Sequence, residues 1–154
     1  MAKPSAHLGS HYARIGRTRR FGHSTDGHGV SKLGNRRGPR VSGATMTRIA
    51  LLFPGQGSHE AGMEEAVAGS ELLAAGLAML DYDPFSRLDE GTRYQQPALY
   101  LCSVAAWELA GRPDALAGAG HSLGEYAALV AAGALAFGDA LHLVDIRAAA
   151  MAAA

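Results

Sequence analysis

Cysteine is almost absent from this chain of 154 residues, in which Cys102 is the only one. A single cysteine excludes an intramolecular disulfide and is typical of a reducing compartment, so we expect a cytoplasmic protein. No apolar run approaches the roughly 20 residues that cross a membrane, and no apolar segment of a secretory signal follows the first basic residues. Zinc-ligand spacing of cysteine and histidine is missing, as is a glycine-rich phosphate loop. These absences predict neither membrane association nor a metal site.

Acidic residues are nearly missing from residues 1–45, which contain nine lysines and arginines but only one acid, Asp26. Residues 46–154 contain five basic and thirteen acidic residues, so net charges of +8 and −8 cancel in the whole chain. The first segment also has eight glycines and almost no apolar periodicity. It cannot bury enough apolar surface to offset the entropy cost of ordering, so we predict a disordered basic extension.

Three interpretations of this extension are open. Its positive charge could attract nucleic acid, but no recognisable nucleic-acid-binding module accompanies it, which argues against such a partner. An arginine-rich, acid-poor N-terminus could be an organellar transit peptide, although it has no amphipathic apolar face. The third interpretation is that the true start is Met46 and that the start of the chain is assigned too far upstream. The sequence Met46-Thr47-Arg48-Ile49 favours this third interpretation.

A G-x-S-x-G pentapeptide, Gly120-His121-Ser122-Leu123-Gly124, lies between an apolar run and a helix-like pattern. This is the arrangement of a nucleophile elbow, in which a strand turns sharply into a helix and exposes a serine hydroxyl. We expect Gly120 and Gly124 to be required, because a β-carbon at either position would clash in the tight turn. Backbone N–H groups and the helix dipole would favour negative charge that develops beside Ser122. The alternative is a glycine-rich turn that happens to contain a serine.

Apolar patterns along residues 46–154 predict an α/β fold. Short continuous apolar runs predict buried parallel strands, and longer segments bounded by Pro, Gly or Ser predict helices. The first predicted elements are a strand at 48–53, a helical stretch at 62–80 broken near Gly69-Ser70, and a polar loop at 81–95. A helix at 97–110 follows, with Pro97 in its first turn and Gly111 after its end. The last predicted elements are a strand at 115–120, a helix from the elbow to 132 that stops at Gly133, and a helix from 138 to the end.

Four segments of the chain together resemble a known family. They are Phe53-Pro54-Gly55-Gln56-Gly57-Ser58, Gln95-Gln96-Pro97-Ala98-Leu99, Gly120 to Tyr126, and Arg147. In this order and spacing they resemble malonyl-CoA:acyl-carrier-protein transacylases and the acyltransferase domains of polyketide and fatty acid synthases. The resemblance runs from about 46 to 154 and implies the N-terminal third of an α/β-hydrolase-like domain, preceded by the basic extension. Because the last helix reaches the end of the chain without a cap, we expect a partial domain truncated at its C-terminus.

The resemblance implies transfer of a malonyl group from coenzyme A to acyl carrier protein through an acyl-serine, without a cofactor, in fatty acid or polyketide biosynthesis. Ser122 would be the nucleophile, and the N–H of Leu123, directly after it, is the first expected oxyanion donor. By resemblance the N–H of Gln56 is the second, at a strand end where Gly55 and Gly57 let the main chain approach closely. Without the resemblance, this glycine-flanked segment would be a plain turn.

Arg147 is the candidate clamp for the malonyl carboxylate. Ten helical residues move the chain roughly 15 Å away from the elbow and ten more return it, so Arg147 comes back near the height of Ser122. A guanidinium there can hold a carboxylate with two hydrogen bonds, as the matching family arginine does. The alternative is a solvated arginine beside Asp145 or Asp139. Gln96 matches a family glutamine that lines the acyl pocket; its alternative is a residue that simply precedes a helix.

Ser122 needs a base, because a serine hydroxyl is a weak nucleophile at its ordinary pKa. His121 should point to the other side of the strand end, so we expect it to support the elbow with its flanking glycines. His142 lies on a different helix face from Arg147, and His59 stands where the family commonly has glutamine. The family's catalytic histidine comes from sequence well beyond the elbow. We therefore expect this chain to be an incomplete fragment with little activity.

Two other functions remain open at this point. The chain could be a catalytically silent piece that folds only with a partner. It could also be a serine esterase of the α/β-hydrolase type, which shares G-x-S-x-G but has no use for Arg147 or for the segment from Phe53 to Gly57. The apolar Leu123 resembles malonyl-selective rather than methylmalonyl-selective members of the family.

Overall fold

The computed structural model describes residues 16–17 and 49–154. The predicted disordered extension therefore lies outside the described residues, apart from Gly16–Arg17. These two residues form a short strand, β1, where disorder was expected, and β1 pairs antiparallel with the next strand of the chain. Along the described residues, none of the helices combines the length and the apolar character that a bilayer span needs.

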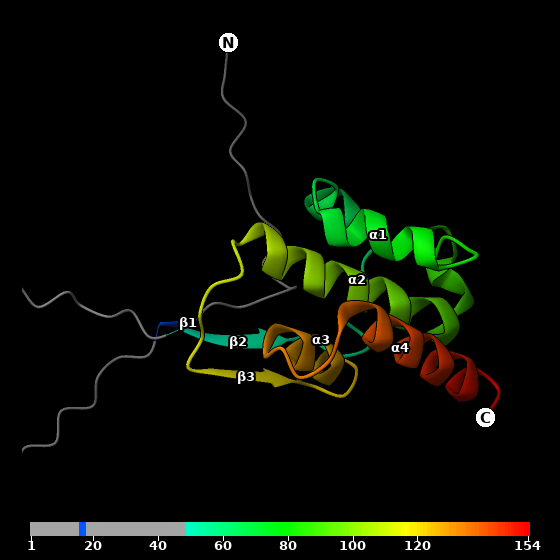
Figure 1. The fold of residues 1–154 in the computed structure, drawn as a ribbon. Helices are drawn as coiled ribbons and strands as arrows, with labels where there is room; N and C mark the ends of the chain where they lie inside the picture. Colours follow the sequence, from blue (N-terminus) through cyan, green and yellow to red (C-terminus); the bar gives the residue numbers. More distant parts are fainter. Residues whose placement is uncertain (1–15, 18–48) are drawn as a thin grey trace, which may run out of the picture.

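A small sheet of order β1-β2-β3 lies to one side of the helices (Figure 1). Strands β2 (Ile49–Phe53) and β3 (Ala117–Gly120) are parallel, and Phe53 pairs with Gly120 where both strands end. This parallel pair and its helices confirm the α/β class. The prediction of a strand buried on both faces is wrong for β2, because Leu52 is 50% exposed while Phe53 is buried.

The helical stretch predicted at 62–80 is broken where expected. A 3-10 helix, η1 (Met63–Val67), comes first, and helix α1 (Glu71–Met79) follows. Ser70 caps α1, because its hydroxyl accepts a hydrogen bond from the N–H of Leu73 at 3.1 Å. The Ser70 cap therefore separates two helices that apolar composition alone would join.

Helix α2 (Thr92–Leu109) begins five residues before the start predicted at Pro97. The predicted loop at 81–95 is wrong in part, since it contains the 3-10 helix η2 (Phe85–Glu90) as well as the first residues of α2. Pro97 cannot donate the N–H that an interior helix position normally donates, which destabilises a helix. Residues 96–105 are all buried, and this burial offsets the cost of the proline.

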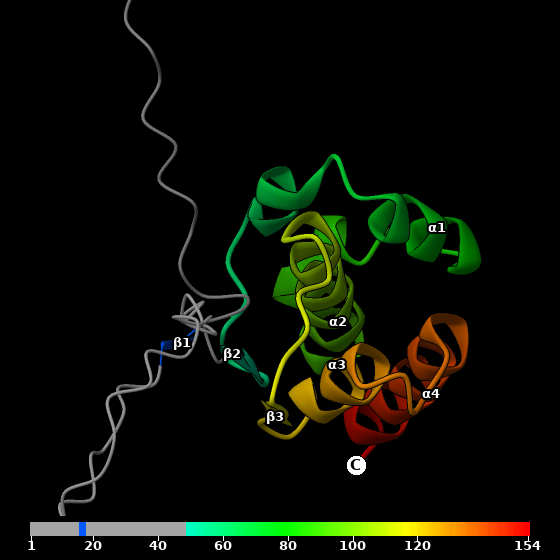
Figure 2. The same cartoon turned by 60° about the vertical axis from the view of Figure 1, so that its left-hand side comes forward.

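Two helices complete the fold, α3 (Gly124–Ala131) directly after the elbow and α4 (Phe137–Ala152). Gly133 adopts a φ of 70° after α3, which confirms it as the predicted stop. Helix α4 begins one residue earlier than predicted and ends at Ala152. Figure 2 shows α2 at the centre of the molecule, with α1, α3 and α4 packed around it. The central helix thus contacts both the helix of the elbow and the helix of Arg147.

A carboxylate connects the start of α1 to the end of α2. Glu108 accepts hydrogen bonds from the Ser70 hydroxyl at 2.5 Å and from the N–H of Leu72 at 3.0 Å, and Arg112 donates to its other oxygen at 2.7 Å. The hydrogen bonds from Leu72 and Ser70 favour the charged form and lower the pKa of Glu108 to about 2. The negative charge also faces the N-terminus of α1, where the helix dipole favours it.

We expect Glu108→Gln to destabilise the fold by about 1.5–3 kcal/mol at pH 7, because the hydrogen bonds lose their charged acceptor and only one of the two oxygens remains. In the wild type this stabilisation is complete above the ordinary pKa of 4.5 and is lost as the pH falls toward the folded pKa of about 2. Thermal unfolding between pH 7 and pH 2 should therefore show the two proteins converging in acid. Glu90→Gln is the matched control, since it removes only an exposed pair with Arg87. A difference that stays constant with pH would contradict the prediction.

Candidate active site

The turn between β3 and α3 has the geometry of a nucleophile elbow. Ser122 has a φ of 52°, in the left-handed region that residues other than glycine rarely adopt. A Cβ at Gly120 would lie 2.0 Å from the carbonyl carbon of Gly124, and a Cβ at Gly124 would lie 2.4 Å from the carbonyl oxygen of Phe53. Both positions therefore require glycine, and the strained turn leaves Ser122 exposed.

The loop after β2 packs directly against this elbow. The backbone N–H of His121 donates to the Phe53 carbonyl at 3.1 Å, and a Cβ at Gly55 would lie 2.4 Å from Nδ1 of His121. The imidazole of His121 thus packs against Gly55 of this loop. Within the described part of the chain, neither Gln56 nor Leu123 donates its backbone N–H to a backbone carbonyl. The two predicted oxyanion donors are therefore amides on neighbouring segments that lack a backbone acceptor, and Leu123 is buried whereas Gln56 is exposed.

Arg147 reaches the elbow from α4. Its guanidinium donates one hydrogen bond to Oγ of Ser122 at 2.9 Å and another to Oε1 of Gln96, which is fully buried on α2. Arg147 itself is half-buried. The structure therefore brings together Ser122, Arg147 and Gln96 from three different elements.

Two further residues belong to this cluster, and sequence reasoning missed both. The hydroxyl of Thr92 accepts a hydrogen bond from Nε2 of Gln96 at 2.7 Å and donates one to Oε1 of Gln56 at 3.0 Å. The sulfur of Met151 accepts from the same Nε2 at 3.3 Å. Thr92 and Gln96 are four residues apart on α2, as are Arg147 and Met151 on α4, so each pair shares a helix face. The spacing could have identified Met151 on the predicted last helix, whereas Thr92 lies in a segment that was predicted to be a loop.

The alternative partner of Arg147, Asp145, is engaged elsewhere. Asp145 accepts hydrogen bonds from Arg93 and from the hydroxyl of Tyr82. Burial opposes ionisation of Asp145, but the hydrogen bonds from Arg93 and Tyr82 outweigh it and lower its pKa. Burial, and next the Asp145 carboxylate, raise the pKa of Tyr82. No ion pair in the described region joins Arg147 to Asp145 or Asp139, and the Arg93–Asp145 pair instead forms a second polar link between α2 and α4.

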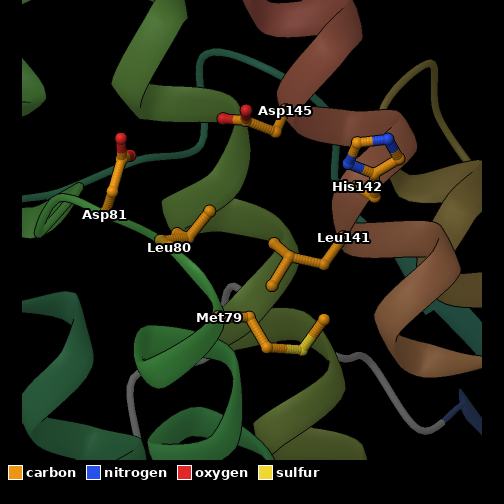
Figure 3. A pocket seen from close by; sticks show the side chains of 6 residues that line it. All are labelled: Met79, Leu80, Asp81, Leu141, His142 and Asp145. Carbon is orange, nitrogen blue, oxygen red and sulfur yellow. The ribbon is translucent and has the colours of Figure 1, made fainter.

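Histidines of the described region do not hydrogen-bond to Ser122, whose partner is Arg147. His142 lines a separate cavity of about 160 Å³ between the end of α1 and α4 (Figure 3), together with Met79, Leu80, Asp81, Leu141 and Asp145. The side chains of the elbow do not line this cavity. Among residues 16–17 and 49–154, no group of three or more His, Cys, Asp and Glu could hold a metal ion.

Proteins similar to this chain transfer malonyl groups. The malonyl CoA-acyl carrier protein transacylase of Salmonella typhimurium is 42% identical over 118 residues, which cover 66% of this chain and 38% of the relative. The crystal structure of MCAT from Streptococcus pneumoniae matches with a TM-score of 0.56 and 39% identity, over 64% of this chain and 36% of the other. A malonyl-transacylase in complex with its type II PKS acyl-carrier protein matches with a TM-score of 0.57 and 37% identity, over 66% of this chain and 38% of the other. No protein-family model matches the chain. This chain thus spans less than two-fifths of the length of each of these proteins.

We expect Gly120→Ala to destabilise the fold by roughly 1–3 kcal/mol or more, because its Cβ meets backbone atoms that cannot move without opening the elbow. Gly118→Ala is the matched control on the same strand, since its Cβ would lie 4.0 Å from Cβ of Ala128, an ordinary contact. The control should stay within about 0.5 kcal/mol of the wild type. Denaturant unfolding measures both variants. Equal losses would show that Gly120 does not approach α3 as closely as described.

Proposed function

This chain belongs to the family of malonyl CoA-acyl carrier protein transacylases, and from that premise we propose that it supplies the nucleophile, the oxyanion donors and the carboxylate clamp of a malonyl transfer. The proposed reaction moves a malonyl group from coenzyme A to the thiol of an acyl carrier protein, in fatty acid or polyketide biosynthesis. The observation that supports it best is the guanidinium of Arg147, which hydrogen-bonds both Oγ of Ser122 and Oε1 of Gln96. A fixed cation beside a strained serine suits an acyl group that ends in a carboxylate.

Each step of the proposed reaction uses one part of the elbow. Oγ of Ser122 attacks the thioester carbonyl of malonyl-CoA while a base removes the hydroxyl proton. The carbonyl oxygen becomes an oxyanion that accepts hydrogen bonds from the N–H groups of Leu123 and Gln56. The carbon–sulfur bond then breaks, coenzyme A leaves as a protonated thiol, and a malonyl ester remains on Ser122. The thiol of the acyl carrier protein attacks this ester and Ser122 recovers its proton, so one thioester replaces another and no cofactor is needed.

The proposed base is not among the described residues. The oxygen of Ser122 accepts a hydrogen bond from Arg147, so the hydroxyl proton is directed away from the guanidinium, toward the side where a base must lie. The matched relatives are more than twice as long as the matched segment, and we assign the base to a part of them that this chain does not match. In a comparable triad, loss of the base costs about 10⁶-fold in turnover, so this chain alone should acylate slowly.

The same proposal includes the organisation of the chain. Residues 46–154 form part of an α/β-hydrolase-like domain, which the strand–elbow–helix arrangement around Ser122 supports. Residues 1–45 form a basic extension that precedes this domain, which their composition supports. Burial, and then the nearby charge of Glu64, raise the pKa of the free thiol of Cys102 to about 12. An unreactive free thiol suits a reducing compartment, so we assign the protein to the cytoplasm.

A serine esterase is the second candidate, and the φ of 52° at Ser122 supports it equally well. An esterase for neutral esters would leave Arg147 without a function, whereas a malonyl group has a free carboxylate for it. A catalytically silent chain is the third possibility, in which the elbow forms but no ester does. The next two experiments separate these candidates.

Ser122→Ala should abolish acyl-enzyme formation, because it removes the nucleophile from the elbow. The whole chain is incubated with malonyl-CoA, with and without imidazole as a substitute base, and its intact mass is followed with time. We expect the wild type to gain one malonyl group, on the peptide that contains Ser122, and to gain it faster with imidazole. The same gain in Ser122→Ala would refute the nucleophile. A folded wild type that never acylates would favour the silent chain.

Arg147→Ala should lower the rate of malonylation while leaving acetylation from acetyl-CoA unchanged or faster. A charge-assisted bidentate contact is worth about 1.5–3 kcal/mol, or roughly ten- to hundredfold in rate. Arg147→Lys is the matched control: it keeps the charge but not the planar pair of donors, so its loss should be smaller. Parallel single-turnover assays with malonyl-CoA and acetyl-CoA give the ratio of the malonylation rate to the acetylation rate for each variant. Equal losses on both thioesters would mean that Arg147 only supports the fold.

A further inference from the structure

The segment that contains Gln56 has little in its own backbone to fix its orientation. Gln56 lies between two glycines, and Gly57 has a φ of 97°, a conformation that only glycine adopts readily. Gly55 is held on one side, because a Cβ there would lie 2.4 Å from Nδ1 of His121. On the other side of Gln56, nothing lies within 4 Å of the position of a Cβ at Gly57. The peptide of Gln56 is therefore packed at one end only.

A hydrogen bond from Thr92 holds the side chain of Gln56. The Thr92 hydroxyl donates to Oε1 of Gln56 at 3.0 Å and accepts from Nε2 of Gln96 at 2.7 Å. A hydroxyl has one proton, so the donation from Gln96 leaves that proton free to point at Gln56. Oε1 of Gln96 accepts from Arg147, which fixes which end of the buried amide faces Thr92. Arg147 therefore fixes the orientation of the Gln96 amide, and the Thr92 hydroxyl links this amide to the side chain of Gln56.

We propose that Thr92 is a positioning residue, which orients the backbone N–H of Gln56 toward the carbonyl that Ser122 attacks. It touches neither the substrate nor Ser122 and acts through the side chain of Gln56. Because Thr92 also accepts from Gln96, and Gln96 accepts from Arg147, the same hydroxyl joins the carboxylate clamp to the oxyanion donor. This inference rests on the proposed function for its chemistry, but its geometry can be tested without catalysis.

The first test measures the backbone motion of Gln56 by ¹⁵N relaxation in the whole chain. Thr92→Val removes the hydroxyl and keeps the shape of the side chain, whereas Thr92→Ser keeps the hydroxyl. We expect the order parameter of the Gln56 amide to fall from about 0.85 toward 0.6 in Thr92→Val and to stay near the wild-type value in Thr92→Ser. Leu123 is the internal control and should not change. An unchanged Gln56 in Thr92→Val, or an equal fall in Thr92→Ser, would overturn the proposal.

The second test compares rates of Ser122 acylation by malonyl-CoA in the presence of imidazole. Loss of one neutral hydrogen bond corresponds to about two- to tenfold, and we expect this loss in the maximal rate of Thr92→Val, with the half-saturating concentration unchanged. Gln56→Met removes the other end of the same bond, so its effect and that of Thr92→Val should not add. Additive effects of the two substitutions, or a change only in the half-saturating concentration of malonyl-CoA, would overturn the positioning role. If the wild type does not acylate, the proposed function fails, while the relaxation measurement still decides on Thr92.

Discussion

The close approach of Gly124 to the carbonyl oxygens of Phe53 and Pro54 is the contact on which the rest of the site depends. A Cβ at Gly124 would lie 2.4 Å from the oxygen of Phe53 and 2.7 Å from that of Pro54, so only glycine fits the first position of α3. This contact places the start of α3 against the end of β2. It therefore fixes the elbow beside the loop of Gln56, and it brings two amides without backbone acceptors onto neighbouring segments. Strain at Ser122 follows from the same geometry, because the chain must turn from the end of β3 at Gly120 into the start of α3 at Gly124.

Burial of Gln96 explains why the remaining polar groups lie where they do. A buried amide that lacks hydrogen-bond partners costs about 1–3 kcal/mol, so all its strong donors and acceptors need neighbours. Arg147 donates a hydrogen bond to the amide oxygen of Gln96, and the amide nitrogen donates to Thr92 and Met151. The position of Arg147 is therefore set by the needs of the core as well as by any substrate. The Arg93–Asp145 pair joins the same two helices nearby, which limits rotation of α4 about its axis.

Sequence reasoning predicted those parts of the site that depend on local chemistry. The elbow could be predicted because glycine is required at two fixed positions, and the return of Arg147 to Ser122 followed from the rise along two helical segments of about ten residues each. Thr92 could not be predicted, because Pro97 is a strong signal for a helix start and tertiary burial overrides it. Exposure of Leu52 was missed for a related reason, since an apolar run does not reveal whether both faces of its sheet are covered. Prediction from local sequence patterns failed where contacts between distant segments determine the helix start or the exposure of a residue.

The hydrogen bonds of Arg147 bear on its proposed role as a carboxylate clamp. A guanidinium has five N–H donors, and Arg147 uses one for Gln96 and one for Ser122, so donors remain for a carboxylate. The side chain is already ordered by these two contacts, so binding a substrate need not immobilise it again, and less entropy is lost. A lysine could satisfy Gln96 but would leave a single ammonium group to serve both oxygens of the substrate. In the proposed transfer, an arginine at this position would thus combine a structural hydrogen bond with a preorganised anion site, and neither use excludes the other.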